Sequence, residues 1–360
     1  MNTTITKIDE VWMRIDSDDD TLMDIYEHFS FFVPNYQFMP AFKYSEWDGK
    51  IHLFDRATQR MEIGLLKRLL AFVGDADIDP KLTPPQELSL KEAEEFVKSL
   101  NLPEHIEVDD YQYDAFLECV NNRRKFIISP TGSGKSLEIY LTANYLHQTY
   151  GYKTLIIVPT TSLTTQMVEE FEEYNQGPVE SHSISAGVDK NVDATYTVST
   201  WQSIGKIPSA QRKKWMNKFD VIIGDEGHTF NGKTLTQIMQ QTDKVEYKFG
   251  FTGTLHDSKT DELQLNAMFG TIKQVVTTEE LQERGRLTKI NIKAIKFKYP
   301  TDMCQLMSKN KDYDKEIDFI EASTARLKKV GNLALSTNKN TLVLFRHIEH
   351  GDKIFEYVRT

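Results

Sequence analysis

The chain has only two cysteines among its 360 residues, Cys119 and Cys304, and they lie far apart. This excludes a disulfide framework, a CxxC redox pair and a cysteine-based zinc site, and it fits a reducing cytoplasm as the expected location. No apolar run approaches the roughly 18 residues that a membrane-spanning helix needs. The N-terminus MNTTITKIDEVWMRID contains no apolar signal region. We therefore expect no membrane partner.

Basic residues are also scarce relative to acidic ones. The chain has 43 Lys and Arg against 53 Asp and Glu, a net charge of −10. Any nucleic-acid site must therefore depend on local basic residues. Residues 1–100 hold 11 basic and 19 acidic residues, whereas residues 40–70 reverse the sign with 6 against 4. The length and the 39% hydrophobic content predict two or three globular domains.

The first hundred residues predict a small α+β domain. Helices are expected at about 21–29, 62–73 and 90–100, and the segment FKYSEWDGKIHLFD (42–55) is expected to form a β-hairpin. Its Asp48-Gly49 pair is a two-residue turn signal, because glycine tolerates positive φ. The segment 79–89 contains three prolines and predicts a linker.

Short apolar runs alternate with helical stretches from about residue 110. Each run is rich in Ile, Val or Phe, and about 20–45 residues separate one from the next, enough for crossover helices. The pattern predicts a parallel sheet with helices on both faces. The predicted strands are 125–129, 154–159, 195–200, 219–225 and 249–254.

A second α/β unit is expected after about residue 285. Strands are predicted at 291–300 and 341–347, and helices at 314–336 and 351–358. Two strands cannot close a parallel sheet, so this part is expected to be half a domain. The predicted domains are 1–100 for substrate recognition, 101–285 for the complete sheet and 286–360 for the incomplete one.

The segment SPTGSGKS (129–136) is the strongest functional motif in the sequence. It follows a predicted strand and opens a predicted helix, so its backbone N–H groups and the positive end of the helix would converge on a phosphate. Lys135 would reach the β- and γ-phosphates of ATP, and Ser136 would ligate Mg²⁺. Ser129 stands where the strict pattern has glycine. The other residues expected to cradle the nucleotide are Thr131, Gly132, Ser133 and Gly134.

The segment DEGH (225–228) ends a predicted buried strand ninety residues later. An aspartate in this position beside a phosphate-binding loop is placed to hold Mg²⁺, which assigns that role to Asp225. Glu226 would orient the attacking water as a general base. Together with the SPTGSGKS segment, DEGH is better explained as part of a site that hydrolyses ATP than as a solvated acidic turn.

These motifs resemble motifs I and II of the DExH-type superfamily 2 helicases, and other segments follow in that family's order. The resemblance assigns adenine recognition to Gln112 and covers residues 110–347. The similar segments are PTTSLTTQ (159–166, motif Ia), STWQS (199–203, motif Ic), TGT (252–254, motif III) and LVLFRH (342–347, motif IV).

The N-terminal FMPAFKYSEWDGKIHLFD with IIVPTTSLTTQM narrows the resemblance to the UvsW-type recombination and repair helicases of T4-like phages. The resemblance implies a RecA-like fold, ATP and Mg²⁺ as cofactors, and branched DNA or R-loops as substrates. It also implies a cytoplasmic location in an infected bacterial host.

Motifs V and VI of that family are not in this sequence, and Arg346 comes too early to be the motif VI arginine finger. Such a finger is worth roughly 10³–10⁵ in turnover. We therefore expect 1–360 alone to bind ATP and hydrolyse it weakly. A separate second RecA-like half, or another recombination protein, is the candidate partner.

Two groups of residues are candidate nucleic-acid contacts. The resemblance places motifs Ia and Ic along the DNA strand, and hydroxyl or amide side chains at helix N-termini suit phosphate contacts, although helix capping explains the same residues. These candidates are Thr160, Thr161, Gln166, Thr200 and Gln202. The predicted hairpin adds Lys43, Trp47 and Lys50, with burial of Trp47 in the core as the alternative.

Motif III and the DEGH histidine would couple the phosphate state to domain movement, through Thr252, Thr254 and His228. The competing functions are a restriction-type double-strand DNA translocase and an ATP-binding DNA-binding module without turnover. Strand displacement driven by ATP distinguishes the helicase from both.

Overall fold

The computed structural model describes residues 3–84, 87–184, 189–190, 192–255, 259–308, 312–337 and 339–359. Its contacts divide the chain into two compact units, Met1–Lys289 and Ile290–Thr360. The predicted domain boundaries after residues 100 and 285 remain predictions. No helix within the described residues is long and apolar enough to cross a lipid bilayer.

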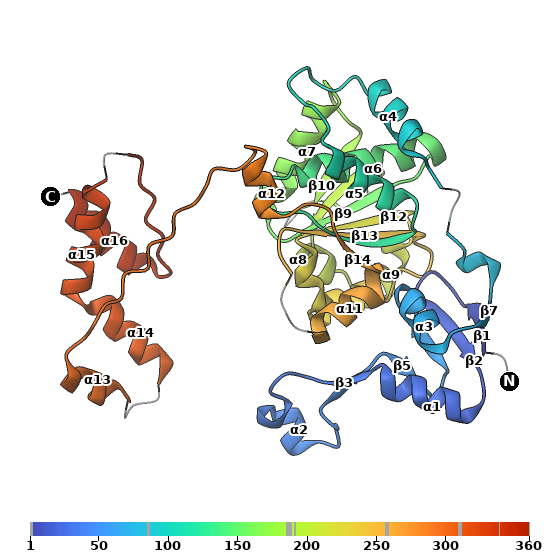
Figure 1. Ribbon diagram of the computed structural model, residues 1–360, viewed down its shortest axis with the longest axis horizontal. Coiled ribbons are helices and arrows are strands. Elements are labelled where there is room, and N and C mark those ends of the chain that lie inside the picture. Colours follow the sequence, from blue (N-terminus) through green and yellow to red (C-terminus); the bar gives the residue numbers. More distant parts are fainter. Residues whose placement is uncertain are drawn as a thin grey trace. The chain divides into compact units, whose positions relative to one another are not determined.

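A five-stranded sheet forms the N-terminal region of the larger unit (Figure 1). Alternate residues such as Met13 and Ile15 point into a core that the helices α1 (Asp19–His28) and α3 (Leu66–Val73) cover. These helices match the predictions at 21–29 and 62–73. In sheet order the strands are β5 (Phe54–Asp55), β6 (Arg60–Glu62), β2 (Trp12–Asp16), β1 (Thr3–Lys7) and β7 (Ala76–Ile78), and the helices are α1 (Asp19–His28), η2 (Ile63–Leu65) and α3 (Leu66–Val73).

The predicted hairpin over 42–55 is wrong. Its first part is helical, in η1 (Tyr36–Phe38) and α2 (Pro40–Tyr44). Its second part, β4 (Lys50–His52), pairs antiparallel with β3 (Ser30–Phe32). Asp48-Gly49 still makes a turn before β4, and the Asp48 carboxylate accepts a hydrogen bond from the Lys50 N–H at 3.0 Å. The local turn signal was correct, but the partner strand lies about twenty residues upstream.

The proline-rich segment 79–89 connects this region to the large sheet, and residues 85 and 86 lie outside the described residues. It contains the short helix η3 (Pro80–Leu82). The helix α4 (Leu90–Ser99) follows, as predicted. Ser89 begins it with a capping box, because the Ser89 and Glu92 side chains satisfy each other's backbone N–H groups.

Seven parallel strands form the large sheet, in the order β10-β11-β9-β12-β13-β8-β14. The five strands predicted from apolar runs are confirmed; the short edge strands β10 and β14 were not predicted, because they lack such runs. The strands are β8 (Arg124–Ile128), β9 (Thr154–Val158), β10 (Ser181–Ile184), β11 (Tyr196–Thr200), β12 (Val221–Asp225), β13 (Tyr247–Thr252) and β14 (Ile272–Gln274).

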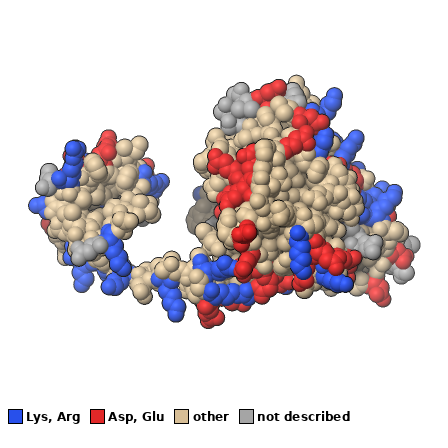
Figure 2. All heavy atoms as spheres, turned by 90° about the horizontal axis from the view of Figure 1, so that it is seen from above, with Lys and Arg blue, Asp and Glu red and all other residues tan. Residues whose placement is uncertain are grey.

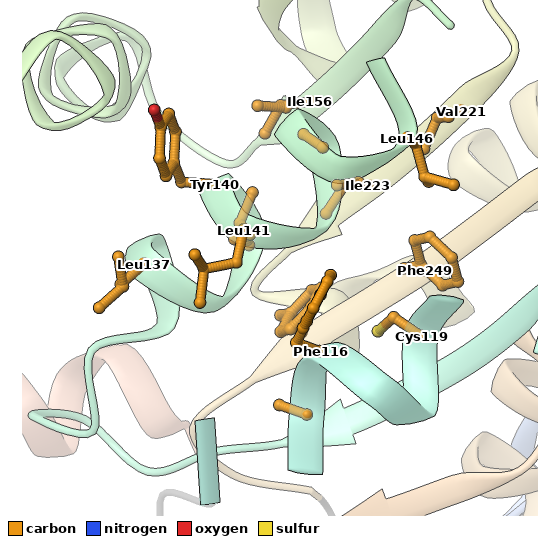
Figure 3. Close-up of a cluster of buried hydrophobic side chains, with 14 of the residues drawn as sticks. Phe116, Cys119, Leu137, Tyr140, Leu141, Leu146, Ile156, Val221, Ile223 and Phe249 are labelled. Atoms are coloured by element: carbon orange, nitrogen blue, oxygen red, sulfur yellow. The ribbon is translucent and has the colours of Figure 1, made fainter. Parts of the chain in front are cut away.

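Helices cover both faces of this sheet, because successive strand residues point to opposite sides. Ile156 and Ile223 belong to the core under α4–α7, whereas Leu155 and Ile222 belong to the core under α8–α11. Figure 3 shows side chains of α5, α6 and the strands packed in the first of these cores. The helices are α5 (Asp110–Val120), α6 (Lys135–Tyr150), α7 (Thr161–Tyr174), α8 (Trp201–Gly205), α9 (Ser209–Met216), η4 (Gly227–Asn231), α10 (Lys233–Met239), α11 (Lys259–Phe269) and α12 (Thr278–Glu283).

The N-terminal region packs against α11 of the large sheet. A Cβ at Gly64 would lie 2.2 Å from the Asn266 carbonyl oxygen, so only glycine permits this close approach. Ala267 of α11 belongs to the same hydrophobic core as the N-terminal strands. The N-terminal region and the sheet therefore share a core.

Buried charged residues lie at this junction, near the amino ends of β8 and β13. Lys248 is 2% exposed, and its Nζ donates to the Glu10 carbonyl oxygen at 2.6 Å. Arg124 Nη2 lies 3.6 Å from Glu10 Oε2, and the buried Glu62 accepts a hydrogen bond from Gln240. Burial lowers the pKa of Lys248 and raises the pKa of Glu62.

The smaller unit contains four helices in its described residues: α13 (Thr301–Ser308), α14 (Tyr313–Ala322), α15 (Thr324–Leu335) and α16 (Ile348–Arg359). The predicted single helix over 314–336 is divided at Ser323, which ends α14 and caps α15. The helix predicted at 351–358 is confirmed as α16. The strands predicted at 291–300 and 341–347 are wrong: neither segment is paired in a sheet. Figure 2 shows basic side chains on the visible face of this unit.

Candidate nucleotide and nucleic-acid sites

The loop between β8 and α6 lies in the SPTGSGKS segment (129–136) and has the geometry of a phosphate-binding loop, which we call the P-loop. Gly132 and Gly134 adopt left-handed conformations, with φ of +86° and +84°. A side chain at either position would be strained there, which explains the glycines. The helix α6 begins at Lys135. Its free N–H groups and its dipole therefore face the loop.

A series of buried hydrogen bonds between side chains supports this loop. The Ser129 hydroxyl lies 2.6 Å from the Ser133 hydroxyl and 2.8 Å from Glu138 Oε1. Burial raises the pKa of Glu138 to about 8, so this carboxyl is mainly protonated at neutral pH. The serine that replaces the usual glycine at position 129 thus joins the strand, the loop and the helix through hydrogen bonds.

Gln112 also contacts the loop. Its Nε2 donates to the Ser133 carbonyl oxygen at 2.9 Å, and its Oε1 accepts from the Asp109 N–H at 3.0 Å. The Tyr111 hydroxyl donates to the same Ser133 carbonyl at 3.0 Å. The α5 amide predicted to recognise adenine is therefore buried against the P-loop, and adenine recognition by Gln112 remains a prediction.

The DEGH residues follow β12 at the carboxyl edge of the sheet. Asp225 ends the strand and is 9% exposed. Burial, followed by repulsion from Glu226, raises the pKa of Asp225 to about 6. Glu226 adopts a left-handed conformation with φ of +50°. Such a backbone costs a non-glycine residue of the order of 1 kcal/mol, which is typical of functional turns.

The P-loop and the DEGH residues line one open pocket with about 850 Å³ of empty space. It combines a lysine with two adjacent carboxylates and the α6 N-terminus, a set of groups that suits a phosphate and a cation together. The lining residues are Thr131, Gly132, Gly134, Lys135, Ser136, Ile139, Leu163, Gln166, Met167, Glu170, Asp225 and Glu226.

The donor set fits Mg²⁺ held jointly with phosphates. Ser136 and Asp225 supply hard oxygen atoms, and Mg²⁺ is usually bound through one or two protein ligands plus substrate phosphates and water. The described residues contain no group of three or more His, Cys, Asp or Glu that could hold a metal without the nucleotide. The Ser136 hydroxyl lies 3.0 Å from the Tyr174 hydroxyl.

Motif III joins this pocket from β13. A Cβ at Gly253 would lie 3.3 Å from Thr131 Oγ1 and 3.5 Å from Lys135 Nζ, so the TGT backbone passes beside the P-loop. Thr252 Oγ1 lies 2.8 Å from His228 Nδ1 and donates to the Thr254 carbonyl at 2.9 Å. His228 Nδ1 is also 3.3 Å from Glu226 Oε2. The predicted coupling residues thus form one hydrogen-bonded group beside Glu226.

The candidate nucleic-acid contacts of motifs Ia and Ic lie in different environments. Thr160 and Thr161, at the start of α7, are exposed, and so is Gln202, whose amide donates to the Pro159 carbonyl at 3.3 Å. Thr200 is buried and caps α8 by accepting from the Ser203 N–H. Gln166 lines the P-loop pocket. Burial disfavours only Thr200. Gln166 is exposed as well but lies in the nucleotide pocket, so Thr160, Thr161 and Gln202 are favoured as nucleic-acid contacts.

The N-terminal candidates lie together around β4. Lys43 in α2 is exposed. Trp47 is partly buried, and its Nε1 donates to the Lys50 carbonyl at 2.7 Å. The Lys50 ammonium lies 5.0 Å from the centre of the Phe32 ring. Tryptophan thus supports the turn, while the two lysines remain on the surface.

Several residues in and around the pocket were not predicted from the sequence. Leu163, Met167 and Glu170 of α7 line it, while Glu138 and Tyr174 contact Ser129 and Ser136 beside it. The i, i+4 and i+7 spacing of these three α7 residues places them on one helix face, so a helical-face analysis of 161–174 is the signal that would have found them.

Known proteins share both parts of the larger unit. Residues 5–82 match the family model "DNA helicase UvsW, N-terminal", and residues 80–257 match "Type III restriction enzyme, res subunit". The ATP-dependent DNA helicase uvsW of Enterobacteria phage T4 is 35% identical to this chain, over 96% of the chain and 71% of the relative.

Two solved structures of the T4 protein have the same fold. One matches with a TM-score of 0.69 and 35% identity, over 76% of this chain and 100% of the solved chain. The other matches with a TM-score of 0.69 and 34% identity, over 100% of this chain and 73% of the solved chain. The predicted α/β fold with a small N-terminal domain is confirmed. The chain belongs to the UvsW family of ATP-dependent DNA helicases.

Proposed function

We propose that this helicase uses Mg-ATP in the P-loop pocket to move on branched DNA or R-loops during recombination and repair. The observation that carries the proposal is the convergence of the P-loop and both DEGH carboxylates on one pocket, with motif III beside the P-loop. The 35% identity to a phage helicase supports DNA as the substrate.

The residues of the pocket would divide the work of hydrolysis. Lys135 and the loop N–H groups hold the phosphates, while Ser136 and Asp225 hold the cation. Bound Mg²⁺ would neutralise charge on the transferring phosphate. Glu226 would accept the proton of the attacking water. The contact between Thr252 and His228 would transmit a movement of Glu226 during hydrolysis to the TGT segment. Thr254 would transmit that movement further along the segment.

The candidate DNA contacts complete the proposal. Exposed Thr160, Thr161 and Gln202 would contact phosphates, with Thr200 positioning the α8 end. Lys43 and Lys50 would contact DNA from the N-terminal region, with Trp47 holding the turn.

The test compares the complete chain with Lys135→Ala and with the control Lys91→Ala, which removes an exposed lysine of α4. Nucleotide binding and hydrolysis are measured with Mg²⁺ and with single-stranded, duplex, four-way-branched and R-loop substrates. We expect hydrolysis and strand displacement to be weak, because motifs V and VI are not in this sequence, and to be strongest with branched DNA or R-loops. Lys135→Ala should lose nucleotide binding, whereas Lys91→Ala should retain it.

A restriction-type translocase is the second candidate, because residues 80–257 match the restriction-subunit family model. Equal stimulation by linear and branched duplex, with no strand displacement, would support it. Nucleotide binding without turnover on any substrate would instead support an ATP-binding DNA-binding module.

A further inference from the structure

The segment 30–45 has an unusual composition for its surroundings. It contains six aromatic residues and one lysine but no acidic residue, whereas residues 1–100 as a whole carry 19 acidic residues. It forms β3, η1 and α2, and β4 pairs with it. We call residues 30–52 the aromatic lobe; α2 lies at its outer end in Figure 1.

Four aromatic side chains of the aromatic lobe lie on its surface. Phe32 is 52% exposed, Phe38 70%, Phe42 37% and Tyr44 87%. Exposure of several large aromatic side chains in one short segment is unfavourable in water and marks a binding surface. A single exposed aromatic residue would not need this explanation.

The rings beneath this surface are held in place. Phe32 stacks on Tyr36 with centroids 4.7 Å apart, and Tyr36 meets the edge of Phe42 at 4.8 Å. A Cβ at Gly49 would lie 2.3 Å from the Tyr36 ring, so the turn backbone packs directly on that ring. Phe32 and Phe42 are therefore held on a packed base, which lowers the entropy lost on binding at these two rings.

Two lysines lie beside these rings, and the turn after α2 adds the acidic residues Glu46 and Asp48. Lys43 lies between Phe42 and Tyr44 in α2, and the Lys50 ammonium lies over Phe32. Aromatic faces beside ammonium groups suit single-stranded nucleic acid, because bases stack on the rings while phosphates meet the lysines. A duplex buries its base faces and would leave the rings unused.

We propose that the aromatic lobe binds unpaired bases at the branch point of DNA, with Phe38 and Tyr44 as stacking residues. Lys43 and Lys50 would contact the adjoining phosphates. This inference deepens the proposed function, on which it rests for branched DNA as the substrate. It names the unpaired bases as the feature that the N-terminal region recognises.

The test uses the complete chain without nucleotide, so that it does not depend on hydrolysis. A three-way DNA junction carries 2-aminopurine at an unpaired position beside the branch, and stacking on a protein ring quenches its fluorescence. The variants are Phe38→Ala with Tyr44→Ala, the rescue pair Phe38→Trp with Tyr44→Trp, and the control Tyr150→Ala, an exposed aromatic residue at the end of α6.

We expect the protein with both alanine substitutions to lose the quenching and to bind the three-way junction about 5- to 100-fold more weakly. The melting temperature of this variant should stay unchanged. The tryptophan pair and Tyr150→Ala should behave as the unaltered chain. Unchanged quenching in the alanine pair would overturn the proposal, and so would an equal loss of affinity for fully paired duplex.

Two further outcomes separate the possibilities. Self-association of the unaltered chain that the alanine pair abolishes, without any effect on DNA binding, would assign the surface to a second copy and overturn the proposal. Quenching without stimulated hydrolysis on any DNA would leave the stacking site supported and would count against the proposed helicase mechanism.

Discussion

The hydroxyl of Tyr174, at the end of α7, lies 3.0 Å from the hydroxyl of Ser136, the candidate Mg²⁺ ligand at the start of α6. Burial raises the pKa of Tyr174, so its hydroxyl stays protonated at neutral pH. The helix that begins with the exposed Thr161 therefore ends on the cation site.

Tyr174→Phe should weaken Mg²⁺-dependent nucleotide binding about 2- to 10-fold, because one hydrogen bond that orients Ser136 is lost. Nucleotide binding measured against Mg²⁺ concentration tests this, with Tyr145→Phe in the same core as the control. An unchanged Mg²⁺ dependence would show that Tyr174 only fills space beside α6.

Asp225→Asn should stabilise the nucleotide-free protein at pH 7 while abolishing hydrolysis. The pKa of Asp225 is raised from 3.8 to about 6, so the folded state binds the proton more tightly than the unfolded state. Stability contributed by protonation is thus lost as pH rises from about 4 to 6, at most about 3 kcal/mol. Asparagine removes that loss.

Thermal melting of Asp225→Asn and the unaltered chain between pH 4 and pH 8 provides the measurement. The difference in melting temperature should grow as pH rises and level off above pH 6. A difference that is constant with pH would contradict the assigned titration.

Thr252→Val should separate hydrolysis from strand displacement. Valine keeps the shape but removes the hydroxyl that contacts His228 and the Thr254 carbonyl. We expect hydrolysis to fall less than about tenfold and strand displacement to fall further, measured on the same branched substrate. Thr229→Val, which removes a hydroxyl bonded to the Glu226 carbonyl, is the matched control. Proportional loss of both activities would argue against a coupling role.

Lys248→Met should destabilise the larger unit by about 1–3 kcal/mol, because it removes the buried hydrogen bond from the Lys248 side chain to the Glu10 carbonyl oxygen. Adding Glu62→Gln should recover part of the loss. Denaturant unfolding of the two single variants and the double variant gives the coupling energy. Additive effects would show that the two side chains do not interact.

Local chemistry explains what the sequence predicted correctly. The P-loop and DEGH were identifiable because each depends on consecutive residues with fixed roles. The five central strands were identifiable because burial on both faces requires continuous apolar runs, as in TLIIV (154–158). The division of the helix at Ser323 was harder to predict, because a single serine within a helical pattern does not indicate that a helix ends there.

The wrong or missing predictions concern contacts between residues that lie far apart in the sequence. The pairing of β4 with β3 depends on which strand lies nearby, and the Asp48-Gly49 turn carries no such information. The segment 291–300 has strand-like alternation and 341–347 has a continuous apolar run, but a strand needs a neighbour for its backbone hydrogen bonds. Tyr174 meets Ser136 across 38 residues; the helical pattern places Tyr174 on the same face as Met167 and Glu170, but it does not identify Ser136 as the partner.

The buried charges at the junction constrain how this family can diverge. Glu10, Glu62, Arg124 and Lys248 come from four separate segments and share one interior environment. Loss of any one alone would leave an unbalanced charge away from water. Among homologous sequences, these four positions should therefore change in concert, and a helicase that exchanges its N-terminal region for another should also exchange the residues at 124 and 248.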